Sequence, residues 1–79
     1  MAQISLDDIK KVEKNRPTIH DKVHSTYSTF DVDGSHYVQI DMLGRVGREM
    51  PGKLSQSIQL DKEAAAFLVD LLKREFDLP

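Results

Sequence analysis

The 79-residue chain contains no cysteine and no tryptophan. The lack of cysteine excludes disulfide bonds and every metal site that needs a thiolate ligand. A chain of this length buries only about 60% of the surface that it exposes when unfolded, so its stability is marginal without further help. Dimerisation is the common remaining way to bury more surface, and we therefore expect that the chain can form a homodimer.

The chain also lacks a large excess of charge of either sign. It has 11 basic and 13 acidic residues and a formal net charge of −2, which argues against a protein whose whole surface attracts nucleic acid. The charges are unevenly spread, however, because eight of the basic residues lie between positions 10 and 53: Lys10, Lys11, Lys14, Arg16, Lys22, Arg45, Arg48 and Lys53. A local basic patch is compatible with this distribution.

Long apolar runs are missing as well. No segment approaches the roughly 20 apolar residues that a membrane-spanning helix needs. The first residues, Met1 to Ser5, lack the basic and apolar regions of a signal peptide. We therefore expect a cytoplasmic protein without a membrane partner.

The clearest pattern that is present lies in the last third of the chain. Apolar and polar residues alternate over 54–60, which is typical of a half-buried strand. Asp61 stands where the N-cap of a helix belongs, and apolar residues then recur at steps of three and four up to Phe76. This pattern predicts a strand that runs into an amphipathic helix over 61–76.

A β-hairpin is predicted over 22–43. Two runs rich in strand-forming residues, 23–30 and 36–42, flank Asp33-Gly34, a favoured pair for a two-residue type I′ loop. That loop would pair Phe30 with Tyr37 and would give the hairpin two unlike faces. One face would carry Val23, Tyr27, Val38, Ile40 and Met42. The other would carry His24, Thr26, Ser28, Phe30, Tyr37, Gln39 and Asp41.

The predicted fold is therefore a single α+β domain over 1–79. Residues 1–21 would form a short N-terminal helix, capped by Ser5, and a loop. Residues 22–60 would form an antiparallel meander of three or four strands, with the optional strand near 45–50. We expect the helix over 61–76 to cover the Tyr27/Ile40 face and to leave Phe30 and Tyr37 in water.

The best candidate for a functional segment is the glycine-rich stretch 44–53. Glycines let backbone N–H groups approach an anion closely, and Arg45, Arg48 and Lys53 would supply positive charge. The stretch lacks the spacing of a P-loop. Contact with a protein partner, or a plain connection between strands, are the alternatives to nucleic-acid binding here.

The face of the hairpin that carries Phe30 and Tyr37 is the second candidate. A cross-strand aromatic pair can simply stabilise a hairpin. It can also offer a platform on which bases stack. Ser55, Ser57 and Gln59 alternate along the predicted strand 54–60 and would line the same open face.

Metal binding and catalysis find little support. His20 and His24 stand four apart in a stretch that reads as loop and strand, where such spacing separates side chains instead of converging them. His36 is expected to pair across the hairpin with Asp31. No nucleophile elbow or pair of carboxylates in a predicted pocket is present, so we expect neither an enzyme nor a cofactor.

Residues 22–76 resemble, in their order of elements, the PC4-like single-stranded-DNA-binding fold. The matching residues run from Pro51-Gly52-Lys53 through Ile58-Gln59-Leu60-Asp61 into the helix. This resemblance implies a curved antiparallel meander before one helix and a nucleic-acid ligand. The stretch from Gln39-Ile40-Asp41 to Asp61 also resembles small bacterial proteins labelled methionyl-tRNA formyltransferase. That activity is not carried over, because it needs a folate-binding domain larger than this chain.

From these observations we expect a small non-enzymatic binding module. Its ligand would be nucleic acid, held by the basic glycine-rich stretch and the open sheet face. The alternative is a small regulatory or inhibitory protein, of the kind that phages and mobile elements encode, that docks on a larger protein.

Overall fold

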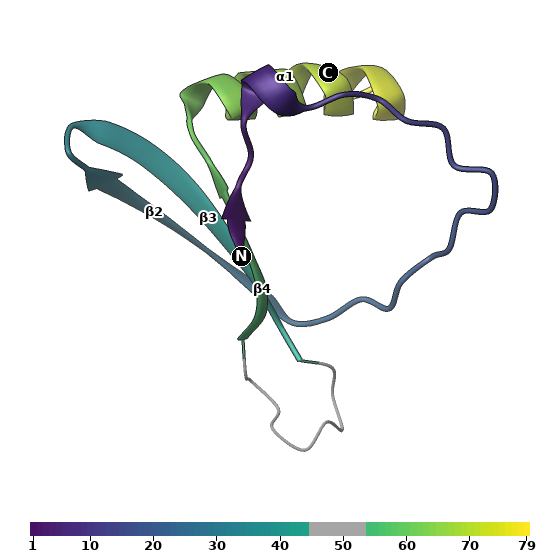
Figure 1. Ribbon diagram of the computed structural model, residues 1–79, viewed down its shortest axis with the longest axis horizontal. Helices are drawn as coiled ribbons and strands as arrows, with labels where there is room; N and C mark the ends of the chain where they lie inside the picture. The colour runs from purple at the N-terminus through teal and green to yellow at the C-terminus, as the bar shows by residue number, and fades with distance from the viewer. Residues whose placement is uncertain (45–53) are drawn as a thin grey trace.

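The chain folds as an α+β unit in the computed structural model shown in Figure 1, which describes residues 1–44 and 54–79. The elements are β1 (Ala2–Gln3), the 3-10 turn η1 (Leu6–Asp8), β2 (Ser25–Val32), β3 (Ser35–Leu43), β4 (Leu54–Leu60) and α1 (Lys62–Phe76). The four strands form one sheet in the order β1-β4-β3-β2. This confirms the predicted α+β class with one C-terminal helix.

The β2–β3 hairpin forms in the predicted register. Asp33 and Gly34 have φ angles of 51° and 83°, as a type I′ loop requires. Phe30 pairs with Tyr37, and Tyr27 pairs with Ile40. Because side chains alternate along each strand, this register also fixes which residues share a face of the sheet.

The sheet is mixed, which corrects the prediction of a purely antiparallel meander. β3 and β4 are antiparallel, but β1 adds to the far edge of β4 in parallel, with Ala2 beside Ile58 and Gln3 beside Gln59. The backbone N–H of Ile4 donates to the carbonyl of Gln59 at 3.0 Å and extends this pairing. The further strand predicted near 45–50 lies outside the described residues.

The predicted N-terminal helix is wrong. Only the three-residue turn η1 forms, and the Ser5 side chain makes no capping hydrogen bond. A helix of about ten residues with a thin apolar stripe is marginal by itself, and here the residues before it are held extended by pairing with β4. Residues 9–24 contain no helix or strand, so the connection to β2 is longer than predicted.

The C-terminal helix begins as predicted. The Asp61 carboxylate accepts a hydrogen bond from the backbone N–H of Ala64 at 2.9 Å, which is the geometry of an N-cap. At the other end Asp77 adopts a left-handed conformation with φ 52°, and its N–H donates to the carbonyl of Lys73. Each end of α1 therefore has a local capping hydrogen bond.

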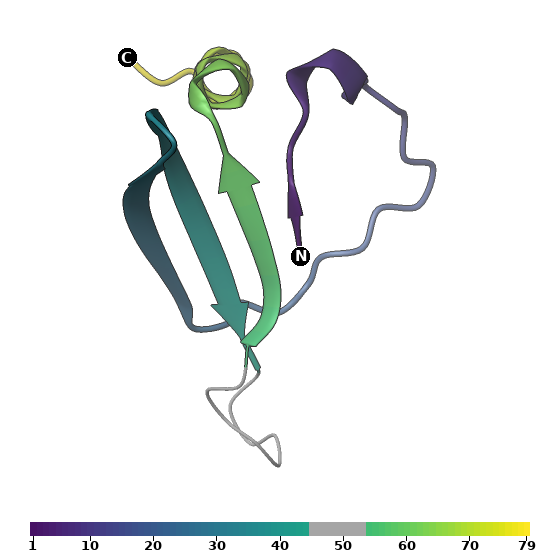
Figure 2. The ribbon, with the colours of Figure 1, turned by 60° about the vertical axis from the view of Figure 1, so that its left-hand side comes forward.

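The position of α1 differs from the prediction. It packs against β4 and η1, and Figure 2 shows it end-on beyond the end of the sheet instead of across a face. Tyr27 remains 79% exposed and Ile40 37% exposed, so the helix does not cover the side of the hairpin that was expected to be the core. Only Asp61 separates β4 from α1, and the helix therefore departs from the point where the strand ends.

Candidate nucleic-acid interface

Register brings most of the predicted site residues to one face of the sheet. Asp41 on β3 pairs with Thr26 on β2 and with Ser57 on β4. Gln39 on β3 likewise pairs with Gln59 on β4. We call this surface the polar face; its members are Gln3, Thr26, Ser28, Phe30, Tyr37, Gln39, Asp41, Ser57 and Gln59. The opposite surface, the apolar face, carries Tyr27, Val38, Ile40, Met42, Ile58 and Leu60.

An aromatic pair stands at the hairpin end of the polar face. The ring centroids of Phe30 and Tyr37 are 6.0 Å apart, and the ring planes are inclined by 31°. This separation lies within the range of stabilising aromatic pairs. Both side chains are half-buried, and the main contacts of α1 are with β4 and η1. Tyr37 also lines a hollow of about 380 Å³ together with Asp61 and Lys62 at the start of α1. The two rings are thus partly open to a ligand.

A chain of side-chain hydrogen bonds crosses the middle of the polar face. Gln3 donates through Nε2 to Oε1 of Gln59 at 3.4 Å, and Gln59 donates through Nε2 to Oε1 of Gln39 at 2.8 Å. Gln39 in turn donates through Nε2 to Oδ1 of Asp41 at 2.8 Å. The three amides point their donors in one direction, toward Asp41, and are held in a fixed orientation across three strands.

Asp41 is the acceptor at the end of this chain. Its Oδ1 also accepts a hydrogen bond from the Ser57 hydroxyl at 2.5 Å. The hydrogen bonds from Ser57 and then from Gln39 lower the pKa of the Asp41 carboxyl, because both stabilise the ionised form, while partial burial acts in the opposite direction. The polar face therefore carries a negative charge at neutral pH.

The polar face is slightly hollowed beside β1. A depression of about 290 Å³ is lined by Met1, Ala2, Gln3, Gln39, Ser57 and Gln59. Of the predicted site serines, Ser57 lines this depression and is 8% exposed, whereas Ser55 is exposed. The hydrogen-bond pattern was not predicted from the sequence, but the alternation of Ser57 and Gln59 with Gln39 and Asp41 carried the signal.

The predicted cations belong to the glycine-rich stretch 44–53. Arg45, Arg48 and Lys53 lie outside the described residues. The chain enters that segment after Gly44 and leaves it before β4, at the end of the sheet opposite the Asp33-Gly34 turn (Figure 1).

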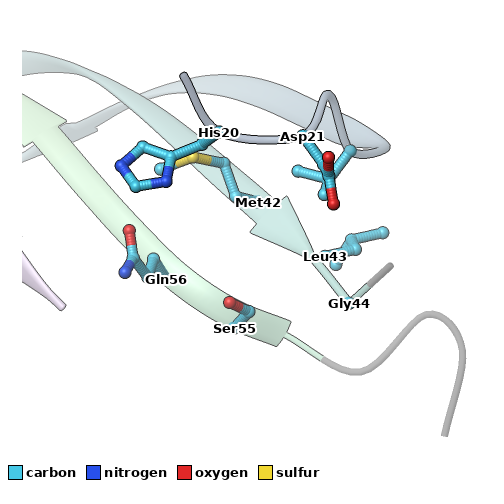
Figure 3. A pocket seen from close by; sticks show the side chains of 8 residues that line it. His20, Asp21, Met42, Leu43, Gly44, Ser55 and Gln56 are labelled. Carbon is cyan, nitrogen blue, oxygen red and sulfur yellow. The ribbon is translucent and has the colours of Figure 1, made fainter. Parts of the chain in front are cut away.

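A second hollow, of about 420 Å³, lies at that end of the sheet. It is lined by His20, Asp21, Val23, Met42, Leu43, Gly44, Ser55 and Gln56. In Figure 3 the His20 ring lies on the Met42 and Gln56 side, and Asp21 lies on the Leu43 side. The sequence indicated His20 only as a loop residue, and its approach to β3 and β4 was missed because the contact is distant along the chain.

The other histidine prediction with a named partner is confirmed. His36 Nδ1 lies 2.8 Å from Asp31 Oδ1 across the hairpin.

Within residues 1–44 and 54–79, no three His, Cys, Asp or Glu side chains gather as a metal site would require. In the same part of the chain, no helix is long and apolar enough to cross a membrane.

The fold and the site together define a small α+β sheet with one open, amide-rich face. Comparisons with protein-family models, with curated proteins and with solved structures give no match. Any function must therefore be argued from the polar face itself.

Proposed function

We propose that the protein is a non-enzymatic binding module that holds single-stranded nucleic acid on its polar face. The observation that supports this proposal is the juxtaposition of the Phe30–Tyr37 pair with the oriented amides of Gln39 and Gln59 on one partly exposed face of the sheet. Unpaired bases present both a flat surface and hydrogen-bonding edges. The polar face offers a partner for each.

The aromatic pair supplies the stacking surface. Stacking of a base on an aromatic side chain contributes about 1–3 kcal/mol and tolerates every base, because each base has a π-face. In a duplex the faces of the bases are already stacked on their neighbours. A platform of this kind therefore favours single strands.

The glutamine side chains supply the polar contacts. A glutamine amide carries both donors and acceptors, so it can match the edge of a base in either sense. The Asp41 carboxylate, at the end of the chain of side-chain hydrogen bonds, can only accept hydrogen bonds, which suits the amino groups of cytosine, adenine or guanine. It also disfavours phosphate at that point, so the backbone of the ligand would run along the rim of the face.

Phosphate contacts are proposed for Arg45, Arg48 and Lys53, which precede β4 in the sequence. Three such contacts on a single strand give a slope of about −2 in a plot of log K against log salt. Affinity should then fall roughly 20-fold between about 50 mM and 200 mM salt. The PC4-like resemblance, which is based on the same segment, agrees with this ligand class.

A catalytic role is not proposed. Ser57 donates its hydroxyl hydrogen to Asp41, and within the described residues no imidazole contacts that hydroxyl. In that part of the chain the partner of the Ser57 hydroxyl is a carboxylate with a lowered pKa, and no base is placed to activate the serine.

The alternative is a docking module for a larger protein. β2 forms the outer edge of the sheet over eight residues, and an exposed edge strand can pair with a strand of another chain. This reading assigns no part to the aromatic pair or to the amides. Substitutions in the aromatic pair therefore distinguish protein docking from nucleic-acid binding.

The test is fluorescence anisotropy with labelled single-stranded DNA, single-stranded RNA and duplex DNA of about 20 nucleotides, at about 50 mM salt. We expect micromolar binding of a single strand by the native chain. Phe30→Leu/Tyr37→Leu keeps apolar bulk but removes both rings, and should weaken binding at least about tenfold.

Tyr27→Leu is the matched control, since it makes the same change on the same hairpin but on the apolar face. Its affinity should equal that of the native chain. Equal losses in the two variants, or no binding by the native chain, would refute the proposal. Retention of one protein from a nuclease-treated lysate, together with absent oligonucleotide binding, would favour the docking alternative.

A further inference from the structure

The chain exposes more surface than a compact chain of its mass. Its accessible surface is 7318 Å², against about 4,900 Å² expected for a folded monomer of this size. Its radius of gyration is 14.9 Å, against roughly 11.6 Å for a compact chain of this length. The structure thus leaves about 2,400 Å² of surface that a closed monomer would bury.

Part of that surface is the apolar face. Tyr27, Ile40 and Ile58 form one row across β2, β3 and β4. Tyr27 is 79% exposed and Ile40 is 37% exposed. A sheet face of this composition normally packs against a helix or a second sheet.

A second apolar surface lies on α1. Val69, Leu72 and Phe76 are 49%, 44% and 69% exposed, although they fall at the steps of three and four that place side chains on one stripe. With half-buried Ala65 they form what we call the outer stripe. Ala64, about 100° around the helix from Ala65, is 1% exposed and belongs to the side that is buried within the chain itself.

We infer that a second copy of this chain covers both surfaces, with the outer stripe of each α1 packed on the apolar face of the other chain. Each chain exposes a sheet face that no helix covers and a helix stripe that no sheet covers. In a dimer with two-fold symmetry, the outer stripe of each copy can pack on the apolar face of the other, so both surfaces of both chains are buried.

The exposed surface area is consistent with a second copy of the chain as the partner. A standard interface needs about 800 Å² from each partner, and obligate dimers use more. The surplus of about 2,400 Å² over a compact monomer is larger than this contribution. The polar face lies on the other side of the sheet and stays open in the dimer, so this inference does not depend on any ligand.

The first test is the mass of the native chain, free of nucleic acid, by sedimentation equilibrium from about 1 to 100 μM. We expect twice the chain mass of 9.0 kDa, and a thermal midpoint that rises with protein concentration. A folded species of 9.0 kDa with a concentration-independent midpoint would overturn the inference, as would an assembly of three or more copies.

Leu72→Lys and Tyr27→Lys place a charge in the two surfaces and should shift the dissociation constant of the dimer at least about tenfold upward, or leave the chain unfolded at low concentration. Ser28→Lys makes the same kind of change on the polar face of β2 and should leave the mass unchanged. Loss of the dimer in Ser28→Lys alone would show that the interface lies on the polar face and would overturn the inference.

The arrangement is tested by cross-linking, because the chain has no cysteine of its own. Copies with Ile40→Cys and tagged copies with Leu72→Cys are refolded together and treated with a short bismaleimide. We expect the mixed product to predominate. Cross-linking of Leu72→Cys only with itself would show that the two helices meet each other and would overturn the proposed packing.

Discussion

At the scale of single residues, Asp41 holds the polar face in order. Its carboxylate is the common acceptor for Ser57 and Gln39, which in turn orients Gln59. Folding favours its ionised form, since those hydrogen bonds lower its pKa below the usual value of 3.8. The resulting stability is complete above that ordinary value and is lost as the pH falls through the lower pKa of the folded state.

A pH titration of stability checks this role. In the native chain the urea midpoint should fall as the pH drops below about 4, and Asp41→Asn should flatten that part of the curve. Asp70→Asn, which changes an exposed carboxyl on α1, is the matched control and should follow the native chain. Identical curves for the native chain and for Asp41→Asn would show that these hydrogen bonds contribute nothing to the fold.

At the scale of elements, the hairpin and the end of α1 are specified locally. Asp33-Gly34 fixes a two-residue loop, and the loop fixes the register that brings Phe30 to Tyr37. Likewise Asp61 caps α1 through Ala64. Both were predictable because each depends on residues that are neighbours in the sequence.

The cap can be tested by substitution. Asp61→Ala removes the acceptor for the Ala64 N–H and should lower the free energy of unfolding by about 1 kcal/mol. Asp61→Asn retains an acceptor and should lose only a few tenths of that. Urea unfolding followed by circular dichroism, at one fixed protein concentration, distinguishes them. Equal losses would show that charge, not capping, matters at this position.

The elements that were mispredicted depend on distant partners. Ala2 and Gln3 pair with β4, more than fifty positions away, and this pairing rather than local helix propensity decides the conformation of the first residues. No local pattern announces a two-residue parallel strand. The resulting mixed sheet and the short turn η1 could not have been read from residues 1–16.

At the scale of the whole molecule, the arrangement of layers was the least predictable feature. The periodicity of α1 shows that it has an apolar stripe but not which surface that stripe meets. Val69, Leu72 and Phe76 remain exposed, and so does Tyr27. The prediction that α1 would cover the Tyr27/Ile40 face assumed that the partner surface belongs to the same chain.

The candidate site was predicted in part. Alternation and register were enough to gather Phe30, Tyr37, Ser57 and Gln59 on one face. The hydrogen bond from Gln3 to Gln59 was not predictable, because it needs β1 at the edge of β4. The roles proposed for Arg45, Arg48 and Lys53 stay predictions, since these residues lie outside the part of the chain that the structure describes.

The central claim, that single-stranded nucleic acid lies on the polar face, is tested most directly by NMR of the side-chain amides during titration with an unlabelled oligonucleotide. The chain has four glutamines: Gln3, Gln39 and Gln59 on the polar face, and Gln56 beside Met42 on the other. The account predicts saturable shifts at Gln39 and Gln59, a smaller one at Gln3, and none at Gln56. Shifts confined to Gln56, or no shift at any of the four, would contradict it.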